Sequence, residues 1–231
     1  MSFSNKIKHW FRDLWRYPLY RPVDASYDTY WSSRDMHTLN SFQRERVRII
    51  AGRLVSGDSV LDVGCGDGRI LEALSVAVSG ITIAGIDSSR EAIRIARERG
   101  LNVGQADIRN LEALNHDRVD WVLLLEVLEH MPESERILAW ARAHARKGVI
   151  VSIPNTGFIL HRLRLLFGRF PLQWRAHPGE HVRFWTLRDA TWWLSSLGLS
   201  ATITCYEGVP VLSALFPSLF AEGIIMCVDP D

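Results

Sequence analysis

The chain has few cysteines and no long uninterrupted apolar run, and each absence excludes a class of protein. Its three cysteines lie far apart among 231 residues and form no CxxC or Cys/His motif, which excludes a disulfide framework and the usual structural zinc sites. The N-terminus lacks the apolar segment of a secretory signal. The most apolar stretch, residues 209–228, contains Pro210, Pro217 and Glu222, so we expect two short buried segments there and no transmembrane helix. These features predict a cytoplasmic protein.

The chain also carries almost no net charge. Its 27 lysines and arginines balance 26 aspartates and glutamates, which leaves +1 with neutral histidines. A surface that wraps DNA or RNA needs a large positive excess, so no nucleic-acid partner is expected. The hydrophobic content of 47% suffices for a sizeable core. We predict a cap segment at 1–35 and one main domain at 36–231, with a lid-like insertion at about 155–188.

Strand-like and helix-like segments alternate between residues 59 and 153. Strands buried on both faces read as nearly continuous apolar runs, and five such runs occur, at 59–63, 81–87, 101–107, 119–126 and 148–153. Amphipathic runs with helical spacing separate several of them. This alternation predicts an α/β fold in which helices cover both faces of a doubly wound parallel sheet. A ligand of such a sheet binds at the carboxyl ends of its strands.

An acidic residue stands at or near the end of each of the first four predicted strands: Asp62, Asp87, Asp107 and Glu126. Because the carboxyl ends of parallel strands meet at one edge of the sheet, these carboxylates would repel each other unless a ligand donates hydrogen bonds to them. A nucleoside with hydroxyl and amino groups is such a ligand. The alternative is that each acid caps a helix, but capping leaves the glycines after the first strand unexplained.

Three glycines alternate with other residues directly after the first predicted strand, in the sequence VLDVGCGDG at 60–68. Gly64 and Gly66 permit positive φ angles and close approach of a ligand, and Gly68 lets the next helix pack near the strand. The spacing GxGxG differs from the GxGxxG of dinucleotide sites, which argues against an NAD-dependent oxidoreductase. Asp62, two residues before Gly64, suits an ammonium group better than a pyrophosphate. The loop therefore favours a zwitterionic ligand.

The loop at 62–68, Asp87, ADI at 106–108 and EVLEHMP at 126–132 together resemble class I S-adenosylmethionine-dependent methyltransferases. A second resemblance, to the methyltransferase type 11 or methionine-biosynthesis protein W-like group, reaches the C-terminus. It rests on VSIPNTG at 151–157, RLRLLFGRFP at 162–171, HVRFWTLRD at 181–189 and PSLFAEGII at 217–225. The resemblance implies a Rossmann-like, mostly parallel sheet of seven strands with the last antiparallel, and places the final two strands at 200–206 and 223–228.

The same resemblance implies a role for each motif residue in holding S-adenosylmethionine. Asp62 would bind the amino group, Asp87 both ribose hydroxyls, and Asp107 the adenine amine. The other cofactor-binding residues that it implies are Gly64, Cys65 and Gly66 along the methionine part, Ser88 next to Asp87, Ile108 through its N–H to adenine, and Glu126 at the sulfonium.

Methyl transfer from a sulfonium needs mainly an aligned acceptor, with a base where the acceptor must lose a proton. His130, which follows Glu126 by four residues on one expected helical turn, is the first candidate for this base and His181 the second; the alternative for each is a structural role. Glu126, Glu129, His130 and His181 also resemble the pattern with which some small-RNA and quinone-precursor methyltransferases hold a divalent cation. Because EVLEH is also widespread in methyltransferases without a metal, no metal ligand is assigned.

Two basic, aromatic segments lie outside the common core. Residues 158–188 contain six arginines and three histidines against one acid, and they would overhang the methyl end of the cofactor. They suit an anionic or sugar-containing small acceptor, unless the arginines simply face water. At the N-terminus, the apolar spacing predicts a helix. It either folds over the cofactor, with Tyr27, Tyr30 and Trp31 nearest the site, or contacts a membrane peripherally through residues 6–20.

Two functions follow from these observations. The first is an S-adenosylmethionine-dependent methyltransferase that acts on a small-molecule acceptor. The second, which comes from the methionine-related resemblance, is a regulatory protein that binds S-adenosylmethionine and partners a homoserine acyltransferase without methylating anything. Consumption of the cofactor distinguishes the two.

Overall fold

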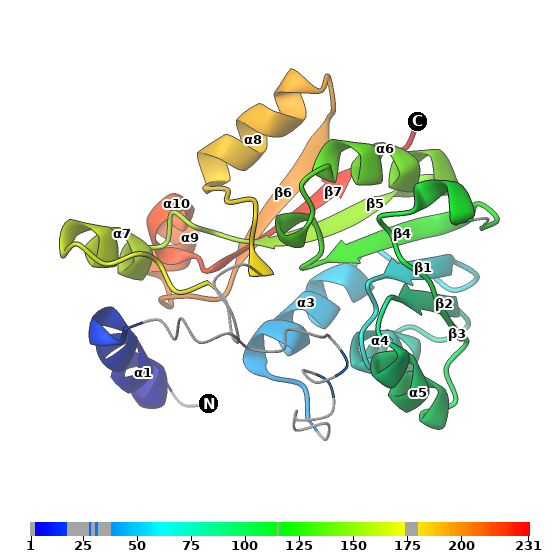
Figure 1. Ribbon diagram of the computed structural model, residues 1–231, viewed down its shortest axis with the longest axis horizontal. Coiled ribbons are helices and arrows are strands. Elements are labelled where there is room, and N and C mark those ends of the chain that lie inside the picture. The colour runs from blue at the N-terminus through cyan, green and yellow to red at the C-terminus, as the bar shows by residue number, and fades with distance from the viewer. Residues whose placement is uncertain (1–2, 18–27, 29–30, 32–37, 115, 174–179) are drawn as a thin grey trace.

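The computed structural model describes residues 3–17, 28, 31, 38–114, 116–173 and 180–231. Within these residues a sheet of seven strands has the order β3-β2-β1-β4-β5-β7-β6 (Figure 1). Its strands are β1 (Ser59–Val63), β2 (Thr82–Asp87), β3 (Val103–Gln105), β4 (Val119–Leu125), β5 (Ala145–Pro154), β6 (Ala201–Tyr206) and β7 (Gly223–Val228). Only β7 runs antiparallel to its neighbours, β5 and β6, in this sheet. The predicted fold class is confirmed, as are the last two strands.

Helices cover both faces of this sheet, as Figure 1 shows. On one face lie α6 (Ser134–His144) and α8 (Leu187–Ser196), and on the other lie α3 (Ser41–Ala51) and α4 (Arg69–Ala77), each pair with its own apolar cluster. α5 (Arg90–Glu98) packs beside β2 and β3. The other helices given by the described residues are α1 (Phe3–Trp15), α7 (Ile159–Leu166), α9 (Leu212–Leu215) and α10 (Pro217–Phe220), with 3-10 turns η1 (Leu111–Ala113) and η2 (Leu128–His130).

The central strand β4 shows why its sequence is apolar throughout. Val122 and Leu124 belong to the cluster under α6 and α8, whereas Trp121, Leu123 and Leu125 belong to the cluster under α3 and α4. Successive side chains of a strand point to opposite faces, so a strand covered on both sides has no polar face. The strand order reverses between β1 and β4, and a ligand of a doubly wound sheet binds at the carboxyl ends of the strands at such a point.

The expectation of two short buried segments at 209–228 is wrong for the first of them. β7 is buried as expected, but Val211, Leu215 and Phe216 are 72%, 64% and 57% exposed. Pro217 begins α10 and separates it from α9, and a helix of four residues cannot bury all of its sides. Among the described residues, no helix has both the length and the apolar content that crossing a bilayer requires.

The N-terminal helix predicted from the sequence is present as α1, and it packs against α7. Of the aromatic residues expected nearest the cofactor, Tyr27 and Tyr30 lie outside the described residues. The Trp31 ring lies beside Gly66. The division into a cap, a main domain and a lid stays a prediction.

Candidate functional site

The loop between β1 and α4 approaches its neighbours so closely that two of its residues must be glycine. Gly64 and Gly66 have φ angles of 81° and 56°, in the left-handed region that glycine favours. A Cβ atom at Gly64 would lie 2.6 Å from the Val127 side chain, and one at Gly66 would lie 2.5 Å from the Trp31 ring. The N–H of Gly64 donates to the carbonyl oxygen of Ile86 at 2.8 Å. The loop is therefore tied to the end of β2.

Asp62 and Asp87 are buried carboxylates beside this loop. Asp62 is 2% exposed, and its Oδ1 atom has no hydrogen-bond partner among the described residues. Burial, and then the charge of Asp87, raise the pKa of Asp62 to about 7. Asp87 accepts from the N–H groups of Gly66 and Ser89, at 2.9 and 2.8 Å, and burial raises its pKa too. A ligand ammonium would supply the donor that Asp62 lacks. Burial also raises the pKa of the Cys65 thiol, which therefore stays neutral.

An open pocket of about 420 Å³ lies at the carboxyl ends of β2 and β3. It is lined by Asp28, Ser88, Ser89, Gln105, Ala106, Asp107 and Arg109. Arg109 pairs with Asp107 at 2.6 Å, and this hydrogen-bonded pairing lowers the pKa of Asp107. Ile108 is buried. The pocket therefore has room for a nucleoside where the sequence predicted one, but Arg109 holds the carboxylate that was expected to bind adenine.

A buried arginine that the sequence analysis did not single out holds Glu126. Nη2 of Arg46 lies 3.0 Å from Oε1 of Glu126, and Ser152 donates to the same oxygen at 3.0 Å. Nε and Nη2 of Arg46 also donate to the Tyr206 hydroxyl at 3.1 and 2.9 Å. Burial alone lowers the pKa of Arg46, but Glu126 and Tyr206 raise it above its ordinary value. The signal for this role was available: Arg46 lies four residues before Ile50, on the buried face of α3.

Glu129, His130 and His181 form a cluster beyond the end of β4. Each contributes a nitrogen or oxygen atom, and these atoms lie within 4.8 Å of one another. Glu129 is fully buried, and neither carboxylate oxygen has a hydrogen-bond partner among the described residues. Burial, and then the charge of Glu126, raise its pKa well above the ordinary value. A buried carboxylate without a donor is costly, so this site is suited to a ligand that brings positive charge or a proton.

The two histidines of the cluster differ in their surroundings. Nδ1 of His130 lies 2.5 Å from the carbonyl oxygen of Glu180 and donates to it, which leaves Nε2, 4.0 Å from Glu129, as the nitrogen with a lone pair. His181 is 9% exposed, and its Nδ1 has no partner in the described part of the chain. Burial, and then His130, lower the pKa of His181 to about 4. His181 is therefore neutral at pH 7.

The path of the chain explains how His181 reaches this cluster. Glu126 adopts a positive φ of 59°, and residues Leu128–His130 form the 3-10 turn η2. Glu126 and His130 therefore do not share an α-helical turn, and that expectation is wrong. The carbonyl of Glu129, left free by the tight turn, accepts from the N–H groups of Val182 and Arg183 at 2.9 and 3.1 Å. These bonds bring the segment around His181 back to η2.

A family model described as a methyltransferase domain matches residues 24–202, which is more than half of the chain. The chain belongs to this family. Its cofactor is S-adenosylmethionine, as the resemblance of its motifs to class I methyltransferases implied. The narrower methionine-related resemblance stays a prediction.

The chain matches curated proteins in sequence over about half of its length, and it matches solved structures in fold over most of its length. It is 34% identical over 121 residues to a ubiquinone biosynthesis O-methyltransferase of Bordetella parapertussis, a match over 50% of this chain and 49% of that protein. The chain thus spans about half the length of the curated relatives it matches. A methyltransferase of Archaeoglobus fulgidus superposes with a TM-score of 0.60 at 19% identity, over 81% of this chain and 93% of that one. Magnesium protoporphyrin IX methyltransferase of Synechocystis, with bound S-adenosylhomocysteine, superposes with 0.59 at 17% identity over 98% and 96%.

An Asp62→Asn variant of the methyltransferase is expected to bind S-adenosylmethionine without the pH dependence of the wild type. With a pKa of about 7, the carboxylate that we predict to receive the ammonium group forms as the pH rises through neutrality, so wild-type affinity should rise between about pH 6 and 8. The raised pKa also means that the native state prefers the protonated acid. Stability of the free protein should therefore fall as the pH rises from 3.8 through about 7, and asparagine should restore roughly 1 to 3 kcal/mol at pH 8.

Titration calorimetry and thermal unfolding at several pH values measure both effects. Asp117→Asn, at an exposed aspartate before β4, is the control and should change neither. A variant of Asp62 that keeps the wild-type pH profile of binding would show that another group receives the ammonium.

Proposed function

We propose that this chain transfers the methyl group of S-adenosylmethionine to an oxygen atom of a small hydroxylated acceptor, held beside Glu126 and the Glu129, His130 and His181 cluster. The observation that carries the proposal is this cluster, in which a fully buried carboxylate and two imidazoles lie beyond β4. The carboxyl end of β4 adjoins the glycine loop, because Val127 touches Gly64. The name of the curated relatives, ubiquinone biosynthesis O-methyltransferase, supports oxygen as the accepting atom.

The cluster fits a divalent cation. A carboxylate and two imidazoles are donors that several divalent metals accept, and neither oxygen of Glu129 nor Nδ1 of His181 has a hydrogen-bond partner among the described residues. We therefore propose Glu129, His130 and His181 as ligands, although the sequence left a metal unassigned. A cation bound here would lower the pKa of an acceptor hydroxyl that contacts it. Arg46 and Ser152 hold Glu126 at the edge of this site.

The proton of the acceptor hydroxyl must pass to a base in either case: with a cation bound, the lowered pKa would let water take it, and without one a side-chain base is needed. Of the two predicted bases, the geometry supports His130, because its Nδ1–H is committed to the Glu180 carbonyl and its Nε2 lone pair is free for a proton or a metal. A pKa of about 4 makes His181 a weak base and a suitable neutral ligand.

The sequence predicted an anionic acceptor from the arginines of residues 158–188, but the contacts of three of these arginines do not support it. Arg164 and Arg169 donate to carbonyl oxygens at the end of α1, and Arg183 pairs with Glu135. These three arginines, which were expected to bind an anion, therefore form hydrogen bonds and an ion pair within the protein. We therefore base the acceptor class on the hydroxyl chemistry of the cluster.

Formation of S-adenosylhomocysteine tests the proposal. The purified protein is incubated with S-adenosylmethionine and a panel of hydroxylated small molecules, with Mg²⁺, Mn²⁺ or Zn²⁺ and with EDTA. We expect product with at least one acceptor and a loss of at least about tenfold on metal removal. Tight cofactor binding without any S-adenosylhomocysteine would instead favour the regulatory partner of an acyltransferase.

A further inference from the structure

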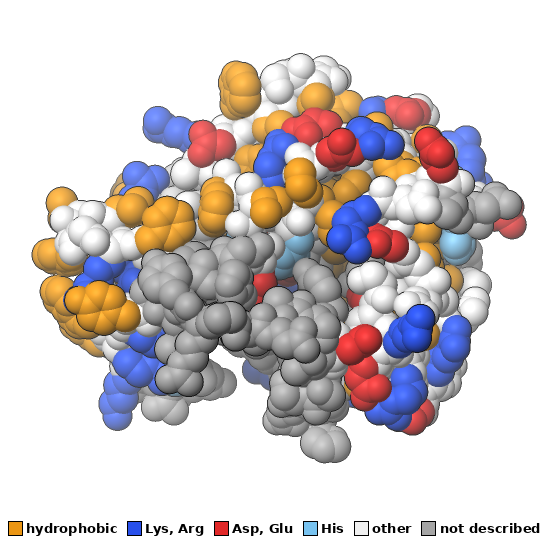
Figure 2. Space-filling view, viewed as in Figure 1, with side chains coloured by type: hydrophobic (Ala, Val, Ile, Leu, Met, Phe, Trp, Pro, Cys, Tyr) orange, Lys and Arg blue, Asp and Glu red, His pale blue; other side chains and the backbone are white. Residues whose placement is uncertain are grey.

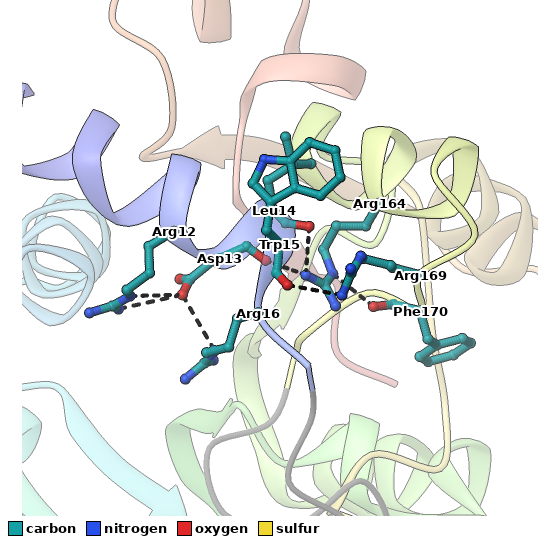
Figure 3. A network of polar contacts seen from close by, with 8 residues as sticks. All are labelled: Arg12, Asp13, Leu14, Trp15, Arg16, Arg164, Arg169 and Phe170. Atoms are coloured by element: carbon teal, nitrogen blue, oxygen red, sulfur yellow. Dashed lines mark hydrogen bonds and ion pairs between the residues drawn. The ribbon is translucent and has the colours of Figure 1, made fainter.

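The N-terminal helix α1 is fastened to α7 at its C-terminal end (Figure 3). The last carbonyl groups of a helix have no partner within it. Here Arg164, which is 1% exposed, donates to the carbonyls of Asp13 and Leu14, the latter at 3.1 Å. Arg169 donates to the carbonyl of Trp15 at 2.9 Å. Two guanidinium groups therefore replace the missing partners and fix the orientation of the helix.

Fixing α1 in this way divides its side chains between two faces. Trp10 faces inward, with its ring 5.5 Å from that of Phe158. The exposed side chains follow a helical stripe in which bases and aromatic rings are mixed: Lys8, Phe11, Arg12, Trp15 and Arg16. Phe11 and Trp15 are 67% and 53% exposed. A free helix could turn such rings inward, but the arginine contacts hold these outward.

α7 and the residue that follows it, Phe167, extend this surface with apolar side chains. Leu165, Leu166 and Phe167 are 55%, 76% and 50% exposed, and the Phe167 ring lies 5.3 Å from that of Trp15. Figure 2 shows hydrophobic and basic side chains together over α7 and α1, at the left of the view. We name the exposed side chains of these two helices the α1/α7 surface. An apolar surface of this kind marks an interaction site.

The charge of the α1/α7 surface is strongly positive. Residues 3–17 and 158–170 contain seven lysines and arginines and a single acid, Asp13, whereas the whole chain has a net charge of +1. Of these seven, Arg164 is buried, and the exposed ones among the described side chains are Lys8, Arg12, Arg16 and Arg162. The remainder of the molecule is therefore net negative. This asymmetry selects an anionic partner. A second copy of the same surface would bring like charges together, which opposes a symmetric dimer through this face.

We infer that the α1/α7 surface docks on an anionic lipid bilayer. Rings of Trp and Phe on a basic amphipathic helix enter the boundary between headgroups and acyl chains, while lysines and arginines contact lipid phosphates. Long cationic side chains can do both, with their stems in the apolar region and their charges at the headgroups. The exposed leucines of α7 add apolar area that a bilayer would bury and that a polyanion such as RNA would leave in water.

Vesicle flotation of the full chain tests this inference. The protein is mixed with vesicles of phosphatidylcholine alone or with roughly 30% phosphatidylglycerol. We expect at least a tenfold preference for the anionic vesicles, and a loss of binding as NaCl is raised from about 0.05 to 0.5 M, because salt screens the attraction. Equal binding to both compositions, or no binding to either, would overturn the inference.

Paired variants locate the binding to this surface. Trp15→Ser, and the double variant Arg12→Glu with Arg16→Glu, should each bind anionic vesicles at least fivefold more weakly. The controls are Trp192→Ser on α8, at a residue 71% exposed, and Arg136→Glu on α6, at a side chain 58% exposed, and both should bind as the wild type does. Equal losses in variants and controls would overturn the assignment of the surface.

Two further measurements distinguish loss of membrane binding from misfolding and from dimer formation. The affinity of each variant for S-adenosylmethionine reports folding, and Phe11→Ser replaces any variant that loses it. Light scattering during gel filtration reports association: a wild-type dimer that Trp15→Ser converts to a monomer would make the face a protein interface and overturn the inference. Neither readout depends on methyl transfer.

Discussion

Replacing Asp87 with alanine is expected to weaken the binding of S-adenosylmethionine by about 1 to 3 kcal/mol, roughly a 5- to 150-fold rise in Kd. Asp87 ends β2 and directs its carboxylate at the loop after β1, where it accepts from the N–H of Gly66; it also accepts from the N–H of Ser89, two residues further along its own chain segment. Two carboxylate oxygens can accept from two ribose hydroxyls at once. Alanine removes both acceptors and leaves the two N–H groups without their present partner.

Titration calorimetry measures this loss of binding free energy, and alanine variants of two other aspartates serve as comparisons. Asp107→Ala should cost less, because the Asp107 side chain is 40% exposed and already shared with Arg109. Asp117→Ala, at an exposed position, should cost nothing. The Asp87 charge also raises the pKa of Asp62, so Asp87→Ala should move the pH dependence of binding to lower pH. Unchanged affinity in Asp87→Ala would refute the ribose assignment.

Replacing Glu129 with glutamine is expected to lower turnover at least about 100-fold while leaving S-adenosylmethionine affinity within about twofold of the wild type. The reason is that Glu129 is buried in the cluster with His130 and His181 and has no hydrogen-bond donor among the described residues. Glutamine keeps the shape of the side chain but removes a charged ligand. Glu133→Gln, whose side chain is 64% exposed, is the matched control and should keep full activity.

The cation itself gives an independent readout of Glu129. Burial and the charge of Glu126 raise the pKa of Glu129, so a proton competes with a metal for this carboxylate to higher pH than usual; cation affinity should therefore rise with pH, and binding to the protonated form should release protons. Calorimetry in buffers of different ionisation enthalpy detects these protons. Wild-type cation affinity in Glu129→Gln, or turnover that is insensitive to both the variant and EDTA, would contradict the proposed site.

The cofactor loop was the part of the site that the sequence predicted best. Gly64, Gly66 and Asp62 are close together in the chain, and their roles depend on backbone conformation and on the end of a single strand. Asp87 could be added because parallel strands end at one edge of a sheet, which brings Asp62 and Asp87 close enough for one charge to raise the pKa of the other.

The acceptor side was predicted less completely. Glu126, His130 and His181 were named, but their geometry depends on the positive φ of Glu126 and on the bonds from residues 182 and 183 to Glu129, which no local pattern encodes. Arg46 and Tyr206 were missed because Arg46 reaches Glu126 from α3 and Tyr206 reaches Arg46 from β6, both far from Glu126 in the chain.

The amino-acid sequence by itself determined the layered α/β sheet, the turn at Gly64 and Gly66, and the identity of the acids at the strand ends, because these depend on local periodicity, glycine stereochemistry and the direction of parallel strands. Tertiary structure decided which buried groups lack a partner, and which side chains of α1 and α7 face outward. Those properties depend on contacts such as that between Arg164 and Leu14, which lie 150 residues apart, and on burial, which only the folded chain defines.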